Sequence, residues 1–236
     1  DYGAGSGTGP GFSITSGYPL KSPAHTNNKI YWDIETPKKQ IYIHHTAGHT
    51  KSPGKTIAGW AKRTDHVATH YITNNLAEKE QVFADEYWAN HLGIPKSTFS
   101  SRNITYQNLN KVSLGIEMQA MGPLKLRNGK YYTYPNSFNN GTISADRVAK
   151  PIDKNGNYTT YKGYTYFEKY NAANIAHVKT IVTGWMSKYG IPFVYDYDIL
   201  FPNLKPLSKI ALSGTPGVFT HNSVRTGKSD VFPQAE

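Results

Sequence analysis

The sequence predicts an α/β fold, namely a single domain with a central mixed β-sheet flanked by helices. Three observations predict it: several short runs are rich in β-branched and aromatic residues, one long segment has an amphipathic helical pattern, and these patterns are interspersed along the chain. Strands interspersed with helices usually build one sheet with helices packed on it. At 236 residues, the chain is long enough for one large domain with a substantial core.

Four short segments have the composition of β-strands. Gln40–His45 is β-branched and aromatic, and it ends where a Thr-Ala-Gly turn sequence begins. Residues 69–73 and 81–84 form two further strand patterns around a polar turn, and residues 112–119 form the fourth. We expect these segments to supply the strands of the sheet.

Two segments have helical patterns. Residues 55–63 predict a short amphipathic helix, and residues 170–189 predict the longest helix of the chain. Gly190 and Pro192 are expected to end the longer one. Its apolar residues recur at steps of three and four, which predicts one buried stripe: Ile175, Val178, Ile181, Val182, Trp185 and Met186.

The remaining segments are polar. Residues 1–20 are rich in Gly, Ser and Thr and predict a flexible linker, preceded by another module, so that the folded domain spans residues 21–236. Residues 122–163 form a polar, Tyr-rich insertion with two Asn-Gly steps, at Asn128 and Asn155, each expected to form a hairpin turn. Beyond residue 190 we expect mostly loops.

Composition narrows the classes of function. The net charge of +10 predicts an anionic partner, such as nucleic acid, a membrane surface or a cell-wall polymer. The basic residues are scattered and no nucleic-acid-binding motif is present, which disfavours nucleic acid. No apolar run approaches the ~20 residues of a membrane span. The absence of cysteine excludes disulfides and thiolate chemistry, and the absence of a GxSxG sequence disfavours a serine hydrolase.

Without cysteine, a transition-metal site must use histidine and carboxylate ligands. His44 ends the first strand, while His221 and Asp230 lie nine residues apart around a glycine-containing loop near the C-terminus. Zinc accepts these donors, and a catalytic zinc site needs three protein ligands. His66 and His70 also have a metal-ligand spacing, but their context is a turn that enters a strand. For them, packing or contact with a substrate is the better interpretation.

Four blocks of the sequence, in this order, carry a resemblance to a known family: IYIHHTAG, THYITNN, WANHLG followed by NLNKVSLGIEM, and HNSVRTGKSD. They resemble zinc-dependent N-acetylmuramoyl-L-alanine amidases of the type-2 class, which are related to peptidoglycan recognition proteins. The resemblance covers residues 39–233 apart from the insertion at 122–163. Four blocks in register are far more specific than any one of them.

The resemblance implies a role for several residues. His44, His221 and Asp230 would hold Zn²⁺, while His45, on the opposite face of its strand, would be packed or hydrogen-bonded. Glu117 would accept the proton of the attacking water, and Lys228 would stabilise the oxyanion. Some relatives carry a catalytic tyrosine where this chain has Thr69, and its absence here favours Glu117 as the residue that accepts the proton. Five residues are candidates for lining the substrate cleft: His70, Trp88, Asn90, His91 and Asn110. Of these, Trp88 fits the core equally well.

The implied reaction is hydrolysis of the amide bond between N-acetylmuramic acid and L-alanine in peptidoglycan, with zinc activating a water molecule. The implied partners are bacterial peptidoglycan and anionic wall polymers, rather than nucleic acid or a membrane. The chain would then be a monomeric domain of a larger modular protein, an endolysin or autolysin, that acts on the cell wall after secretion or phage-induced lysis. The alternative is a peptidoglycan-binding module without catalytic activity.

Overall fold

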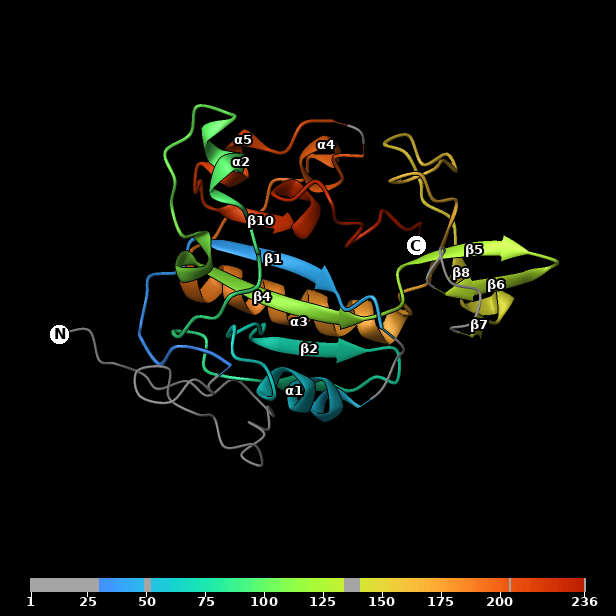
Figure 1. Ribbon diagram of the computed structural model, residues 1–236, viewed down its shortest axis with the longest axis horizontal. Coiled ribbons are helices and arrows are strands. Elements are labelled where there is room, and N and C mark those ends of the chain that lie inside the picture. Colours follow the sequence, from blue (N-terminus) through green and yellow to red (C-terminus); the bar gives the residue numbers. More distant parts are fainter. Residues whose placement is uncertain (1–29, 49–51, 134–140, 204, 236) are drawn as a thin grey trace.

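A five-stranded sheet runs through the centre of the molecule, as the computed structural model of residues 30–48, 52–133, 141–203 and 205–235 shows (Figure 1). The predicted linker at 1–20 lies outside these described residues. The strand order is β10 (Gly217–Thr220), β1 (Gln40–His45), β4 (Ser113–Gln119), β2 (Tyr71–Asn74) and β3 (Lys79–Gln81). The first four strands are parallel and β3 is antiparallel. The prediction of a mixed central sheet is therefore confirmed.

The long helix α3 (Ala172–Tyr189) covers one face of this sheet (Figure 1). The side chain of Asn171 caps its first turn, and it ends at Gly190, whose left-handed φ of 63° a side chain would disfavour. The predicted apolar stripe packs against the sheet, where Val178, Ile181, Val182 and Trp185 meet Ile41, Leu114 and Ile116. Both the helix and its buried face are as the sequence predicts.

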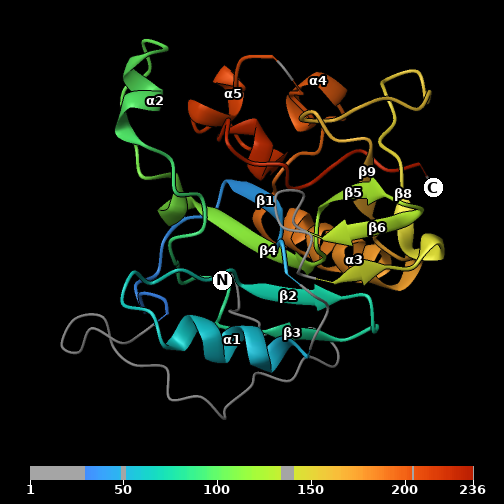
Figure 2. The ribbon, with the colours of Figure 1, turned by 45° about the vertical axis from the view of Figure 1, so that its right-hand side comes forward.

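Shorter elements cover the other face and the β2–β3 edge. Helices α2 (Lys96–Ser100), α4 (Tyr197–Leu200) and α5 (Lys209–Leu212) lie on the side of β10, with a core around Tyr42 and Phe219 (Figure 2). Helix α1 (Pro53–Ala61) lies along β2 and β3 and packs through Ile57. Among the residues described, no helix combines the length and apolar character needed to cross a bilayer.

The insertion and the strand that follows it form a second sheet beside the first one (Figure 2). Its strands are all antiparallel, in the order β7 (Thr142–Ile143), β6 (Lys130–Thr133), β5 (Pro123–Arg127), β9 (Tyr166–Glu168) and β8 (Val148–Ala149). The buried carboxylate of Glu168 accepts a hydrogen bond from Met121 N at 2.6 Å and pairs with Arg147, which ties the two sheets together.

The first Asn-Gly step turns as the sequence predicts. Asn128 and Gly129 both adopt positive φ, 50° and 72°, and join β5 to β6. At Asn155-Gly156 the prediction holds only in part: Gly156 N donates to Asp153 O at 3.0 Å, but a single bridge flanks the turn. Polar side chains on both sides leave too little apolar area for a longer pair of strands.

Several predicted boundaries shift by one to three residues. Helix α1 begins at Pro53, two residues earlier than predicted, because proline suits the first turn of a helix. Strand β2 starts two residues later than predicted, and β3 ends at Gln81, where the prediction began. The segment beyond residue 190 is mostly loops, as expected, and it also contains the short elements α4, α5 and β10.

Candidate active site

The candidate site lies at the carboxyl ends of three adjacent parallel strands. Ile43 of β1 is level with Thr220 of β10, so His44 and His221, the next residues of the two chains, follow side by side. On the other flank, His44 is level with Glu117 of β4. Residues level with one another in a parallel sheet share a face, and ligands commonly bind beyond the carboxyl ends of such strands.

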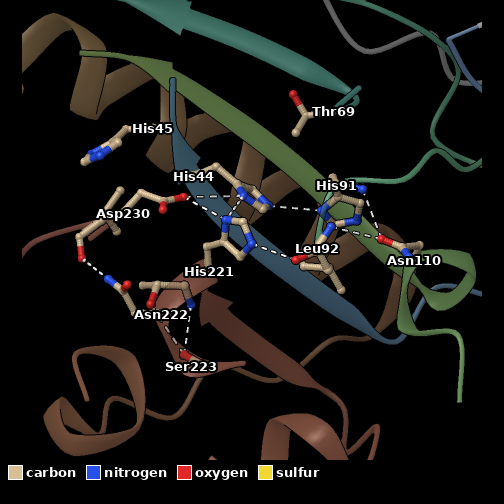
Figure 3. Close-up of polar contacts among 12 residues, drawn as sticks. His44, His45, Thr69, His91, Leu92, Asn110, His221, Asn222, Ser223 and Asp230 are labelled. Atoms are coloured by element: carbon tan, nitrogen blue, oxygen red, sulfur yellow. Dashed lines mark hydrogen bonds and ion pairs between the residues drawn. The ribbon is translucent and has the colours of Figure 1, made fainter. Parts of the chain in front are cut away.

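Three buried side chains converge there (Figure 3). Nδ1 of His44 lies 3.0 Å from Nδ1 of His221 and 3.7 Å from Oδ2 of Asp230. Nδ1 of His221 lies 2.9 Å from the same carboxylate oxygen. The sequence thus brings together, from positions 177 residues apart, the donor atoms that the motifs single out.

Short-range contacts fix the second and third members of this cluster. His221 begins the 3-10 turn η3 (His221–Ser223), which Thr220 and Ser223 cap reciprocally. Asn222 then holds the returning chain, because its backbone N–H donates to Asp230 O at 3.2 Å and its side-chain amide donates to Val231 O at 2.9 Å. The glycine-containing loop between them therefore returns with the Asp230 carboxylate facing His221 (Figure 3).

The hydrogen bonds around the two histidines leave lone pairs facing one another. His221 Nε2 lies 2.8 Å from Leu92 O, and a carbonyl only accepts, so the proton is on Nε2 and Nδ1 carries a lone pair. His44 Nε2 lies 3.0 Å from His91 Nδ1, and His91 Nε2 lies 2.8 Å from Ser113 Oγ. With Nε2–H of each ring donating along this chain, Nδ1 of His44 is also unprotonated.

Electrostatics agree with that assignment. Burial and, to a smaller extent, the neighbouring His221 together lower the pKa of His44 to about 4 against the opposing effect of Asp230, so the imidazole is neutral at pH 7. Burial alone would raise the pKa of Asp230, but the adjacent His221 and His44 hold it well below its usual range. Two imidazole lone pairs and a carboxylate at these distances repel one another unless a cation lies between them. The donor set, two nitrogens and one oxygen, fits zinc.

One segment, His91–Leu92, supports both histidines from behind. The His91 ring contacts His44, the Leu92 carbonyl contacts His221, and the side-chain oxygen of Asn110 accepts hydrogen bonds at 3.0 Å from both backbone N–H groups of the segment (Figure 3). Such outer contacts orient metal ligands and fix their tautomers. Asn110, expected to line the substrate cleft, instead holds this supporting segment.

Gly115 of β4 makes room for the His91 ring, which leads to a test of this support. A Cβ at Gly115 would lie 2.9 Å from His91 Nδ1 and 3.1 Å from Thr69 Cγ2. We expect Gly115→Ala to displace the ring from His44, to weaken zinc binding roughly 10- to 100-fold, and to cost about 1–3 kcal/mol of unfolding free energy through overpacking. Zinc affinity by chelator competition and thermal unfolding measure the two effects.

The matched control is Gly184→Ala in α3, where a Cβ meets nothing within 4 Å. It should leave the zinc affinity unchanged. If Gly115→Ala binds zinc as tightly as the unaltered chain, His91 does not orient His44.

Glu117 and Lys228 line the same cavity of about 580 Å³ as the three converging residues. Burial raises the pKa of Glu117 to about 8, and Asp230 adds to the shift, whereas Lys228 opposes it. Glu117 is thus a half-buried carboxyl group beside the cluster, with an affinity for protons suited to acid–base chemistry near neutral pH. Lys228 is half-buried and close enough to influence Glu117 and His44 electrostatically.

His45 is hydrogen-bonded, as predicted. Its Nδ1 lies 2.7 Å from the hydroxyl oxygen of Tyr170, on the α3 side of the sheet, while His44 points to the other side (Figure 3). Its ring still reaches the wall of the cavity because the strand ends there. The alternation of side chains along the strand therefore predicts correctly that His44 and His45 point to opposite faces of the sheet.

The five residues expected to line the cleft have different environments in the structure. Of the five, only His91 lines the cavity. His70 is 0% exposed, with Gly115 N donating to its Nδ1 at 3.1 Å and its Nε2 3.1 Å from Tyr87 O, so it is a core residue. Trp88, 6% exposed, stacks on Trp32 at 4.0 Å between centroids. The amide of Asn90 donates to Asp65 O.

Two residues of the cavity wall escaped the sequence reasoning. Trp60 and Arg63, at the end of α1 and just beyond it, line the cavity together with Thr56 and Thr69. Only the position of α1 along β2 brings them there, and nothing in their local sequence predicts that packing.

Comparison with known proteins gives a likeness of general fold. No protein-family model and no curated protein sequence matches the chain. Solved structures similar to it include a mutant endolysin from Bacillus subtilis (13% identity, TM-score 0.44, 90% of this chain and 86% of that one). Others are the N-acetylmuramoyl-L-alanine amidase LysC from Clostridium intestinale (10%, 0.40, 84% and 79%) and the N-acetylmuramyl-L-alanine amidase AmiD from E. coli (17%, 0.38, 66% and 45%).

The last two proteins carry the name N-acetylmuramoyl-L-alanine amidase.

Proposed function

We propose that this chain is a zinc-dependent amidase that hydrolyses the bond between N-acetylmuramic acid and L-alanine in bacterial peptidoglycan. The observation that carries the proposal is the convergence of His44, His221 and Asp230 at a cavity that Glu117 and Lys228 also line. Two of the four sequence blocks supply the three converging residues, and a third block supplies Glu117. A set of such side chains at one cavity supports a hydrolytic site better than any single motif does.

Each residue has a role that follows from its chemistry. His44, His221 and Asp230 would hold the zinc ion, which when bound supplies Lewis-acid chemistry by lowering the pKa of water and polarising a carbonyl group. Glu117 accepts the proton of the attacking water and returns it to the amine of L-alanine as the C–N bond breaks. Its raised pKa suits a group that must keep that proton until the amine leaves. The Lys228 ammonium stabilises the negative charge that develops on the carbonyl oxygen.

The cell wall follows as the place of action. The net charge of +10 would draw the protein to anionic wall polymers and raise its concentration at the substrate. We propose a monomeric catalytic domain, linked through residues 1–20 to a further module of an endolysin or autolysin, that reaches the wall by secretion or by phage-induced lysis.

Removal of the metal tests the proposal directly. We expect the purified protein to contain about one zinc per chain, to clear a suspension of cell walls, and to release free N-terminal L-alanine. Dialysis against a chelator should abolish both readouts, because without zinc the three ligand residues cannot polarise the carbonyl group of the amide. Added zinc should restore both readouts. Elemental analysis, turbidity and amino-group labelling measure these outcomes.

Clearing that persists in protein shown to be free of zinc would refute the metal-dependent reaction. Wall binding without any release of L-alanine, with zinc present, would favour the alternative of a non-catalytic peptidoglycan-binding module.

A further inference from the structure

A second groove opens beside the candidate active site. It has a volume of about 470 Å³ and shares residues Gly227, Lys228 and Ser229 with the cavity of the converging histidines. Its other wall comes from the end of the insertion and from the segment before α5, through Lys162, Tyr164, Asn203 and Lys205. We call it the lysine groove. The two hollows therefore border each other along residues 227–229.

Lys162 is the distinctive residue of the lysine groove. It is half-buried, and burial lowers the pKa of its amine, yet no carboxylate of the described residues forms an ion pair with it. Its amine nitrogen lies 6.0 Å from the centroid of the Tyr161 ring. Lys205, by contrast, is exposed and pairs with Asp198 at 2.6 Å. A partly desolvated ammonium group without a counter-charge is costly unless an anion joins it.

The backbone holds Lys162 in place. Its φ is +52°, a conformation that side-chain-bearing residues rarely adopt, and its N–H donates to Asn203 Oδ1 at 2.6 Å. The amide of Asn203 donates in turn to Thr160 O at 2.9 Å, and Tyr161 and Tyr164 exchange backbone hydrogen bonds across the turn. Lys162 and Gly163, with φ of +52° and +83°, are the two central residues of the tight turn between Tyr161 and Tyr164, and this turn fixes the position of Lys162.

The cavity and the lysine groove therefore form two unlike arms that share residues 227–229. One arm runs toward α1 and is lined by Trp60 and Arg63, and Arg63 is already paired with Asp65. The other arm is the lysine groove, which passes Lys228 and reaches the unpaired Lys162. The two arms suit a substrate whose halves, on either side of the reacting bond, differ in charge.

We propose that the lysine groove binds a carboxylate of the peptide half of the substrate, with Lys162 as the residue that recognises it. This inference rests on the proposed amidase function. In that reaction the carboxyl group of the sugar half is consumed in the amide bond itself. The peptide half begins at the leaving amine and carries free carboxylates further along. The Lys162 ammonium group in the neighbouring groove thus selects for the peptide half and orients the amide bond in the cavity.

Two muramoyl peptides test the proposal, one with free carboxylates and one with the same groups converted to carboxamides. We expect the unaltered chain to favour the carboxylate peptide in kcat/KM by about tenfold, as for a charge-assisted contact. Lys162→Gln should reduce this ratio to near one, mainly through KM. Lys150→Gln is the matched control, since Lys150 lies over the Tyr158 ring in a different groove, and it should keep the full ratio.

The outcomes separate this inference from the function on which it rests. If Lys162→Gln keeps the tenfold preference, the inference is wrong while the amidase function stands. If the unaltered chain hydrolyses neither peptide, the amidase function is wrong, and titration calorimetry with the two intact peptides decides the inference: equal affinities overturn it. If both peptides behave alike but Lys162→Gln loses affinity for a polyol-phosphate wall polymer, the groove binds that polymer instead and the inference is overturned.

Discussion

Replacing His221 by alanine is expected to remove both the bound zinc and the hydrolytic activity. His221 is central to the cluster, because its Nδ1 faces His44 and Asp230 while its Nε2 bonds to Leu92 O. A catalytic metal supplies several kcal/mol of transition-state stabilisation, so activity should fall by roughly a thousandfold or more. Zinc content after gel filtration and release of L-alanine from walls measure the two losses.

Two further variants make this result specific. Asp230→Asn keeps the shape of the side chain but removes its charge, so it should also lose zinc even if His221→Ala is too unstable to purify. His177→Ala in α3 is the control, since His177 bonds to the backbone oxygen of Ala77 and does not line the cavity. A His221→Ala protein that is folded and still contains stoichiometric zinc would contradict the proposed ligand set.

Replacing Glu117 by glutamine is expected to keep the zinc and lose turnover. Glutamine preserves the volume of the side chain at the cavity wall but cannot accept a proton, and loss of a general base typically costs 10²- to 10⁴-fold in rate, so we expect about that decrease in kcat. Glu35→Gln is the control, because Glu35 is exposed and outside the cavity. Retained turnover in Glu117→Gln would refute the role of Glu117 as the base.

The pH dependence of kcat adds a second readout for Glu117. Burial raises its pKa to about 8, so without a nearby cation the protonated, inactive form dominates below that pH. A divalent cation in the cluster favours the charged carboxylate and lowers this pKa. The zinc enzyme should therefore lose activity as the pH falls through a value below 8, and this acid limb should disappear in Glu117→Gln.

Local sequence patterns predict the regular elements of the fold well. Strands β1 and β4 and helix α3 carry long, periodic or β-branched patterns, and they lie where the sequence places them. β10 escaped prediction because it has only four residues, in GVFT, and owes its existence to pairing with β1. The second sheet contains strands of two residues, which have no local signature at all.

In the candidate site, too, some features could be predicted from local sequence and others could not. Donor atoms in recognisable blocks, such as those of His44, His221 and Asp230, could be singled out from the sequence, and they converge. The contacts behind them could not, since no local pattern reveals that His91 meets His44 or that His70 faces the core. Such contacts depend on the packing of segments far apart in the chain, and in particular on the space that Gly115 leaves open.

The wide separation of His44 and His221 also bears on the order of events during synthesis. While the ribosome is still making the segment before Gly217, strand β1 lacks its β10 neighbour, and two of the three proposed donors do not yet exist. A partly made chain therefore has an open sheet edge and no means of capturing an ion. Once residues 217–230 have been made, β10 can pair with β1 and the three proposed donors can come together, so the site cannot form before the segment through Asp230 exists.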